Sequence, residues 1–231
     1  MSDQGRAAGD RPAGRDPGRL IPRFTVTERV AHWLLAATFA AMLGTGVLMG
    51  GIGPLGHHAV LVVHVGSAAV LLAGIALLTA RRRSRRPLAQ TVHDLRSLGP
   101  ADRRWLRLAP RAYLAGGALP PSGRFNAGQK VNARLVLFVL AVLYLSGLGE
   151  LGRFTSLLGP LRILGAPHGL AAGVAAVLIA GHIYLALLHR ATRPALRGIT
   201  LGSVRREWAE HHHADWVAAV DADAARGERG R

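Results

Sequence analysis

Hydrophobic residues are concentrated in four long windows that hold few or no charged side chains, at about 30–50, 57–80, 132–151 and 162–189. Each window has the length of about twenty residues that an α-helix needs to cross roughly 30 Å of hydrocarbon. Thr25 and Glu28 have the spacing of a capping box, so we expect the first helix to begin just after Thr25. The pattern predicts an all-α integral membrane protein with a four-helix transmembrane bundle over residues 23–200.

Basic residues mark one end of the predicted spans. Arginine clusters follow the second span, at 81–87, and the fourth, at 189–197. The short links at 50–56 and 151–161 hold at most one basic residue each. Because positively charged loops stay on the cytoplasmic side of a membrane, we expect both termini and the central loop 81–130 to be cytoplasmic.

The segments outside the spans are polar. Residues 1–22 are rich in Gly, Pro and Arg and are predicted to be disordered. No cleavable signal peptide is expected, because the first apolar window is long enough to span the membrane. The cytoplasmic loop 81–130 should be partly helical, with LAQTVHDLRSLG as an amphipathic stretch. Residues 201–231 are predicted to form a soluble amphipathic helix and a charged tail, with the histidines 211–213 on a solvated face.

Composition removes several classes of function. The net charge of the 231 residues is +16, but the basic clusters flank apolar windows instead of gathering on one folded face with interleaved aromatic residues. We therefore expect no nucleic acid as a partner. The sequence has no cysteine, which excludes disulfides, iron–sulfur ligation and the covalent attachment of a c-type haem. Any redox centre in this chain must be held by other side chains.

Histidines occur inside the predicted spans, at His32, His64, His168 and His182. An ionisable side chain is costly in hydrocarbon, so its presence there indicates a function. His168 and His182 are 14 residues apart, which places them on one helix face and about 21 Å apart along the axis. With the expected orientation, His182 lies level with His32 on the cytoplasmic side, and His64 lies level with His168 on the external side.

Two imidazoles that face each other at one depth are the axial ligands of a six-coordinate haem iron. The histidines therefore form an inner pair, His32 with His182, and an outer pair, His64 with His168. Together they predict two b-type haems stacked across the membrane. Gly and Ala residues beside the histidines leave room for a flat macrocycle, although small residues are also usual where membrane helices pack.

Several alternatives stay open at this point. His57 or His58, at the mouth of the second span, is an alternative to His64 as the outer ligand. Zinc fits pairs at two depths poorly, because it needs three or four converging ligands. A haem-free membrane anchor or assembly protein with structural histidines is a second function, and a transporter with a histidine proton relay is a third.

Three stretches of the sequence resemble one family of membrane proteins: ERVAHWLLAATFAAMLGTG, FNAGQKVNARLVLF and LRGITLGSVRREWAEHH. Together with the paired histidines of the fourth span, they are similar to the cytochrome b (gamma) subunit of respiratory formate dehydrogenase. More broadly, the chain resembles the dihaem cytochromes b of membrane-bound hydrogenases and thiosulfate reductases. The likeness covers about residues 20 to 216 and implies a multi-pass protein of the bacterial inner membrane.

The resemblance implies a role for each candidate residue. The haem ligands of the family match His32, His64, His168 and His182. Electrons would enter from an external iron–sulfur beta subunit, itself coupled to a molybdenum or tungsten catalytic subunit, and would reduce menaquinone beside the inner haem. No formate-oxidising chemistry is expected in this chain, and a subunit other than this one decides whether the donor is formate, hydrogen or another reductant.

The quinone site of the family matches Asn126, Gly128 and Gln129. Asn126 and Gln129 also have the spacing of an N-cap and an N3 residue, so a purely structural role at the start of the third span stays open. The basic loop and tail are expected to contact partner subunits or anionic membrane lipid.

Overall fold

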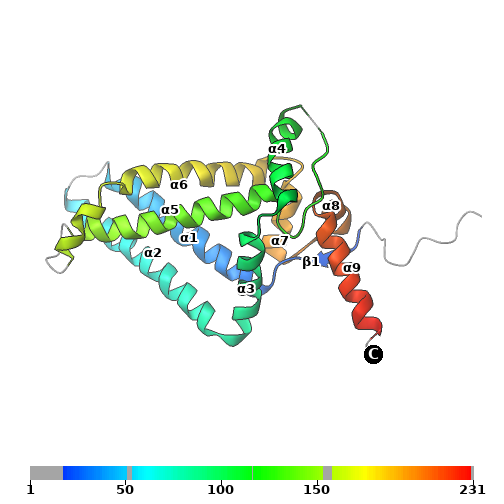
Figure 1. The fold of residues 1–231 in the computed structure, drawn as a ribbon. Coiled ribbons are helices and arrows are strands. Elements are labelled where there is room, and N and C mark those ends of the chain that lie inside the picture. The colour runs from blue at the N-terminus through cyan, green and yellow to red at the C-terminus, as the bar shows by residue number, and fades with distance from the viewer. Residues whose placement is uncertain (1–17, 51–53, 116, 153–157, 230–231) are drawn as a thin grey trace, which may run out of the picture.

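The computed structural model describes residues 18–50, 54–115, 117–152 and 158–229. Four long helices form the body of the molecule (Figure 1): α1 (Val26–Met49), α2 (Pro54–Ala80), α5 (Ala127–Leu151) and α6 (His168–Ile183). The last of them continues as a π-helical turn, η2 (Tyr184–Leu188). All four are long and apolar enough to cross a membrane. The predicted all-α membrane bundle is confirmed.

The outer surface of the four helices is apolar. Large hydrophobic side chains point outward and are more than half exposed, among them Val62, Leu72, Phe138, Leu170 and Val177. A surface of this kind would drive aggregation in water, whereas in a bilayer it faces lipid tails. The helices satisfy their backbone hydrogen bonds internally, as the hydrocarbon requires.

The bundle consists of two helical hairpins. α1 packs along α2, and α5 packs along α6. The hairpins meet in a small apolar core that includes Phe39 of α1, Val139 of α5 and Ala175 of α6. Small side chains on α6 let the helices approach closely, which is how membrane helices associate. On α6 this core lies between the two histidines of that helix.

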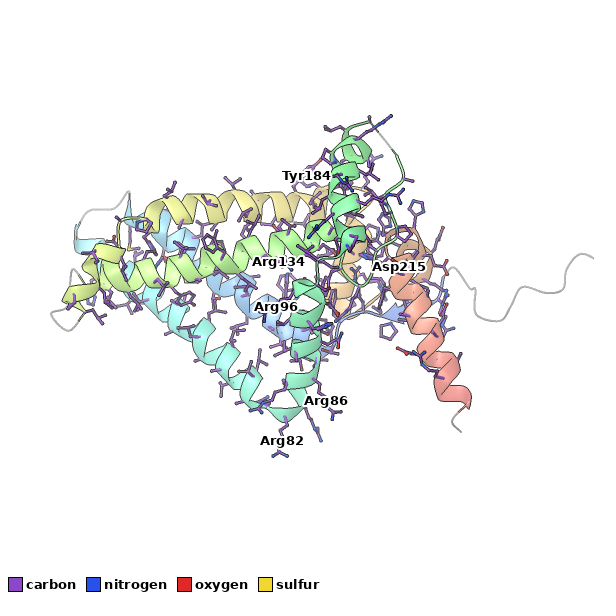
Figure 2. The ribbon with its side chains drawn as sticks, viewed as in Figure 1. Arg82, Arg86, Arg96, Arg134, Tyr184 and Asp215 are labelled. Atoms are coloured by element: carbon purple, nitrogen blue, oxygen red, sulfur yellow. The ribbon has the colours of Figure 1, made fainter. Side chains whose placement is uncertain are left out.

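Shorter elements gather at one end of the bundle, which we call the basic end (Figure 1). They are α3 (Arg82–Arg96), α4 (Pro100–Ala115), η3 (Arg193–Ala195), α7 (Leu196–Leu201), α8 (Arg206–His212) and α9 (Ala214–Arg229). Figure 2 shows Arg82, Arg86 and Arg96 of α3 at this end, with Arg134 of α5 nearby. The 3₁₀ turn η1 (Gly159–Leu164) lies at the opposite end.

The fourth spanning helix begins later than its apolar window, at His168, the later start that Arg162 and Pro167 near the beginning of the window leave open. The apolar window starts at residue 162, but Gly159–Leu164 forms η1 and α6 begins at His168, directly after Pro167. Proline has no N–H to donate, so it is tolerated at the start of a helix and not within it. The predicted span is therefore wrong for its first six residues, and His168 stands in the first turn of α6.

The end of the segment that was predicted to be disordered is a strand. Leu20–Pro22 (β1) pairs antiparallel with Ser203–Arg205 (β2). Ile21 and Val204 from the two strands are buried in one small hydrophobic cluster at the basic end. The prediction of disorder is wrong for β1, because burying Ile21 orders the backbone around it. Residues 1–17 lie outside the described part of the chain.

A buried histidine joins distant segments at the basic end. The Nδ1 of His213 donates to the carbonyl of Gly123 at 2.8 Å, and Arg23 Nη2 donates to its Nε2 at 3.0 Å. Burial and the Arg23 charge lower the pKa of His213 to about 3, so the ring is neutral. The Arg23 guanidinium also lies over the rings of Trp208 and Trp216. The expected solvated face is therefore wrong for His213, which is 1% exposed.

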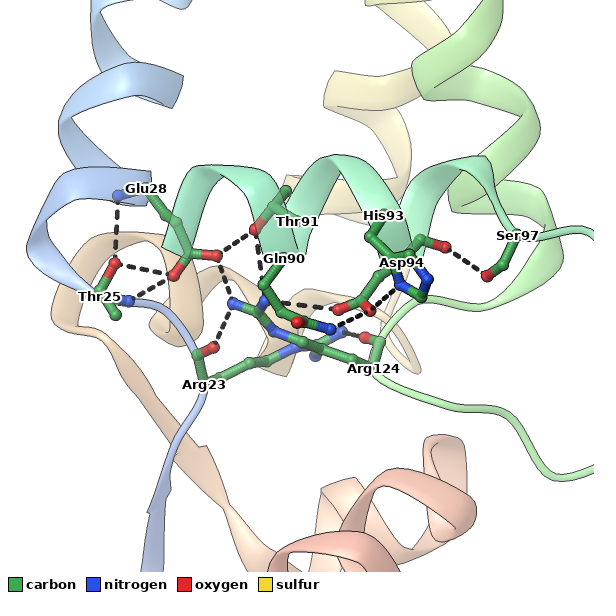
Figure 3. A network of polar contacts seen from close by, with 9 residues as sticks. All are labelled: Arg23, Thr25, Glu28, Gln90, Thr91, His93, Asp94, Ser97 and Arg124. Carbon is green, nitrogen blue, oxygen red and sulfur yellow. Dashed lines mark hydrogen bonds and ion pairs between the residues drawn. The ribbon is translucent and has the colours of Figure 1, made fainter. Parts of the chain in front are cut away.

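A second polar cluster joins α1, α3 and the chain before α5 (Figure 3). The predicted capping box is confirmed, since Thr25 accepts from the amide of Glu28 and the Glu28 carboxylate accepts from the amide of Thr25 at 2.8 Å. The same carboxylate accepts from Arg124 Nη2 at 2.5 Å and from the hydroxyl of Thr91. With a side chain only 5% exposed, Glu28 fixes where α1 begins.

The ion pair of Glu28 predicts a stability effect. Arg124→Ala leaves a buried carboxylate without its cation, and we expect this to cost about 3 kcal/mol of unfolding free energy. Arg226→Ala, which removes an exposed pair with Asp223, should change it by less than about 0.5 kcal/mol. Thermal unfolding of the full chain in detergent measures both variants, and equal midpoints would contradict the role assigned to Glu28.

The buried neutral His213 predicts that stability falls in acid. Its pKa is about 3 in the folded chain against 6.5 in an unfolded one, so between these values the unfolded state binds the extra proton. The stabilising contribution is complete above pH 6.5 and is lost as the pH falls below it, by up to about 1.4 kcal/mol per pH unit. Thermal unfolding between pH 8 and pH 5 measures this slope.

His213→Gln should be less stable than the wild type at pH 8 and should show a smaller loss between pH 8 and pH 5. His211, which is exposed on α8, provides the matched control. His211→Gln should keep the slope of the wild type. If His213→Gln kept it as well, the ring would not be the group that titrates.

Candidate functional site

The structure brings the predicted outer pair together at the end of the bundle away from the basic end. His64 stands on α2 and His168 in the first turn of α6, with ring centroids 6.2 Å apart. The Nδ1 of His64 lies 2.9 Å from the hydroxyl of Thr45 on α1. The Nδ1 of His168 lies 2.9 Å from the hydroxyl of Ser146 on α5. Each ring is thus held by the neighbouring helix of its own hairpin.

The predicted inner pair also comes together, toward the basic end. His32 stands on α1 and His182 near the end of α6, with ring centroids 6.3 Å apart. The Nδ1 of His32 is buried and has no hydrogen-bond partner among the described residues. The π-helical turn η2 begins at Tyr184, two residues after His182. Such turns frequently occur at functional sites.

Each pair has the separation that a shared iron requires. Two imidazole nitrogens bound at about 2 Å on opposite sides of one metal place the ring centroids roughly 6 Å apart. Within the described ranges no group of three or more His, Cys, Asp or Glu converges, so each site offers two protein ligands. Iron in a porphyrin needs two axial ligands and no more. The residues of both pairs therefore fit a haem.

An apolar layer separates the two pairs. Phe39, Val139, Leu140 and Ala175 pack there around a cavity of about 10 Å³. A single water molecule needs about that much space as well as polar partners, and this cavity is lined by apolar side chains that offer none. The two pairs are separated along α6 by about 21 Å of helix.

The predicted quinone residues stand at the first turn of α5. Asn126 is the N-cap, and its Oδ1 accepts from the amide of Gln129 at 2.9 Å. In return, Gln129 Oε1 accepts from the amide of Asn126 at 3.0 Å. The capping role is confirmed, whereas the quinone role stays a prediction. Gly128 lies under the indole of Trp105, because a Cβ added there would come within 3.2 Å of that ring.

Aromatic rings that the sequence did not single out lead from this turn toward the end of α6. The ring centroid of Trp105, on α4, lies 6.4 Å from that of Tyr113. The ring centroid of Tyr113 lies 5.7 Å from that of His189. Burial raises the pKa of Tyr113, so its hydroxyl is protonated and can donate a hydrogen bond. No sequence signal located these rings, because α4 meets α5 and the residue that follows η2 through tertiary contacts alone.

Two hydroxyl residues at the outer pair were also missed. Thr45 and Ser146 are polar positions inside apolar helices, and each is followed by a glycine, Gly46 or Gly147. That repeated pair was the available signal. The sequence alone does not say which histidine each hydroxyl contacts, because that depends on the pairing of α1 with α2 and of α5 with α6.

Of the two alternatives to His64 as the outer ligand, the structure describes the side chain of His58 only. His58 is exposed on α2, about 9 Å from His64 along the helix axis. The side chain of His57 lies outside the described residues. The ring that faces His168 is that of His64.

Comparison with known proteins agrees with this geometry. The family model of prokaryotic cytochrome b561 matches residues 23–202, which contain all four spans and all four histidines. The chain belongs to the prokaryotic cytochrome b561 family. Membership implies a b-type haem and a multi-pass location in the bacterial inner membrane. It also confirms the family resemblance found in the sequence.

Individual relatives of the chain carry more specific names. The cytochrome b556 subunit of nitrate-inducible formate dehydrogenase from Escherichia coli is 26% identical over 108 residues, 46% of this chain and 49% of that protein. The proteins of that name from a second Escherichia coli strain and from Shigella flexneri match equally well. The chain spans about half the length of these relatives. It is thus a cytochrome b561-type membrane subunit related to the cytochrome b of formate dehydrogenase.

Proposed function

We propose that the chain is the dihaem cytochrome b subunit of a respiratory oxidoreductase, most simply of formate dehydrogenase type. Electrons pass from an external iron–sulfur subunit through two b haems to menaquinone at the cytoplasmic side. The observation that carries this proposal is the meeting of two imidazole pairs, at two depths, each with centroids about 6 Å apart. The formate dehydrogenase relatives support the choice of donor complex.

The residues of this chain would have distinct roles. His64 and His168 would hold the outer haem, and His32 and His182 the inner one. A b haem supplies one-electron oxidation and reduction at iron. Two imidazoles leave no open coordination position, which suits electron transfer instead of oxygen binding. The apolar layer around Phe39 would separate the two sites.

The orientation follows from charge. The basic end carries α3, with the cluster 81–87, and the arginines after η2, which favours the cytoplasmic side for that end. Both termini and the loop 81–130 would then be cytoplasmic, and the outer pair would lie toward the external side. Electrons would move inward while quinone takes protons from the cytoplasm, so turnover would build a transmembrane potential.

The quinone would bind where the first turn of α5 meets the end of α6. Asn126, Gly128 and Gln129 stand at this helix start, whose amide N–H groups can donate to a carbonyl oxygen. Tyr113, which is 45% exposed and packs beside the buried Trp105, supplies flat ring surface near it. The neutral hydroxyl of Tyr113 is a donor within the same ring cluster.

Other partners would meet the basic end. An open pocket of about 440 Å³ there is lined by Arg190, Arg193 and Arg197, and its positive charge suits anionic lipid headgroups. The iron–sulfur beta subunit would instead meet the external side, near the outer pair, and its molybdenum or tungsten partner would supply the chemistry of formate oxidation.

Replacement of one inner ligand tests the proposal. His182→Ala should lower the haem-to-protein ratio from two toward one and abolish reduction of a menaquinone analogue by dithionite-reduced protein. His58→Ala should leave both measurements unchanged, which also tests the alternative outer ligand. The measurement is reduced-minus-oxidised absorption of the purified chain against its protein content.

A wild-type chain that expresses fully and binds no haem would contradict the proposal and leave a haem-free anchor. A full haem complement with normal quinone reduction in His182→Ala would contradict the ligand assignment.

The two roles of Asn126 can be separated by substitution. Serine is also a good N-cap, so Asn126→Ser should keep thermal stability, whereas Asn126→Ala should lose about 1 kcal/mol. If the amide also contacts quinone, Asn126→Ser should raise the KM for the quinone about fivefold, the value of one hydrogen bond. Steady-state kinetics and thermal unfolding measure the two effects. A wild-type KM in Asn126→Ser would leave capping as its only role.

A further inference from the structure

The two outer histidines are held in the same way by unrelated stretches of chain. His64 Nδ1 meets the hydroxyl of Thr45, and His168 Nδ1 meets the hydroxyl of Ser146, both at 2.9 Å. In each hairpin the first helix supplies the hydroxyl and the second supplies the histidine. Ser146 is 1% exposed, so water does not compete for its hydroxyl.

Each of these hydroxyls donates its proton in a hydrogen bond to a backbone carbonyl of its own helix. Thr45 Oγ1 donates to the carbonyl of Ala41 at 2.6 Å, and Ser146 Oγ donates to the carbonyl of Val142 at 2.7 Å. A hydroxyl has one proton, so toward the imidazole each oxygen can only accept. The ring must then carry its proton on Nδ1, which leaves the Nε2 lone pair free. The partner of one ring nitrogen sets which nitrogen can bind a metal.

A glycine stands beside each held ring. A Cβ added at Gly46 would lie 3.8 Å from Cε1 of His64, and one added at Gly147 would lie 3.4 Å from Cε1 of His168. A side chain longer than alanine at either position would therefore enter the space of the ring. The glycine thus leaves room for the imidazole, and the hydroxyl contact orients it.

The inner pair is built differently. The buried Nδ1 of His32 has no hydrogen-bond partner within the described residues. A hydrogen bond from Nδ1–H to an acceptor makes the ring a stronger donor at Nε2, which favours the oxidised iron. For His32 to become an equally strong donor at Nε2, its Nδ1–H would need a hydrogen-bond acceptor, and the described residues provide none.

We propose that Thr45 and Ser146 are positioning residues of the outer haem site. They fix the Nδ1–H tautomer and the ring orientation of His64 and His168, and they lower the midpoint potential of the outer haem. The inference rests on the proposed dihaem function. A lower potential at the outer site makes electron transfer toward the inner site downhill, in the direction that the proposed function requires.

The test uses Thr45→Val and Ser146→Ala in the full chain, with redox titration followed by optical absorption. Each variant should keep both haems and raise the midpoint potential of one haem only. Low-temperature electron paramagnetic resonance should show a changed low-spin signal for the same haem, because the ring is free to rotate.

Matched controls separate positioning from general packing. Thr38 of α1 and Ser67 of α2 also donate their hydroxyl protons to carbonyls one turn earlier, Leu34 and Val63, at 2.7 Å. Thr38→Val and Ser67→Ala should leave both potentials at wild-type values. The conservative Thr45→Ser and Ser146→Thr keep a hydroxyl and should therefore keep the low, wild-type midpoint potential of the outer haem.

Wild-type potentials and spectra in both Thr45→Val and Ser146→Ala would overturn the inference. Equal shifts in the Thr38 and Ser67 controls would do so too. Failure of the dihaem proposal itself is seen separately, because it would appear as fewer than two haems in the wild-type chain.

Discussion

The cost of placing an imidazole in hydrocarbon governs this structure. Each intramembrane histidine is a polar group that the hydrocarbon of the bilayer cannot solvate. In the fold the four rings lie together in two pairs. Pairing at a common depth requires that helices from different hairpins keep a fixed register. The outer rings gain hydroxyl partners, whereas His32 keeps a buried nitrogen without one in the described chain. The proposed haem iron between the rings would account for this arrangement.

Register is set at the basic end. The Thr25–Glu28 box fixes the origin of α1, and the carboxylate of Glu28 is tied to Arg124, just before α5. The Asn126–Gln129 box fixes the origin of α5 in the same way. Since a helix rises about 1.5 Å per residue, fixing these two origins fixes the depth of His32 and of Ser146. The polar module outside the membrane therefore determines the geometry of the apolar part.

The sequence alone predicted the spanning helices, the starts of two of them and the placement of two histidines on one helix face. Hydrophobic windows of spanning length predicted the four helices, the capping boxes predicted the starts of α1 and α5, and a spacing of 14 residues put two histidines on one face of α6. The β1–β2 ribbon, the burial of His213 and the hydroxyls at the outer pair were not predicted. Each depends on contacts between segments distant in sequence, which local periodicity does not encode. Pro167 displaced the start of α6 because hydropathy alone does not register a missing N–H.

Whether two imidazoles share one iron at each depth is the central question, and low-temperature electron paramagnetic resonance of the oxidised wild-type chain answers it most directly. Paired neutral imidazoles make ferric haem low-spin, so the account predicts two low-spin signals of equal integrated intensity, each accounting for one spin per chain. A high-spin signal of comparable intensity would mean that one iron lacks its second imidazole, and would contradict the pairing on which the whole description depends.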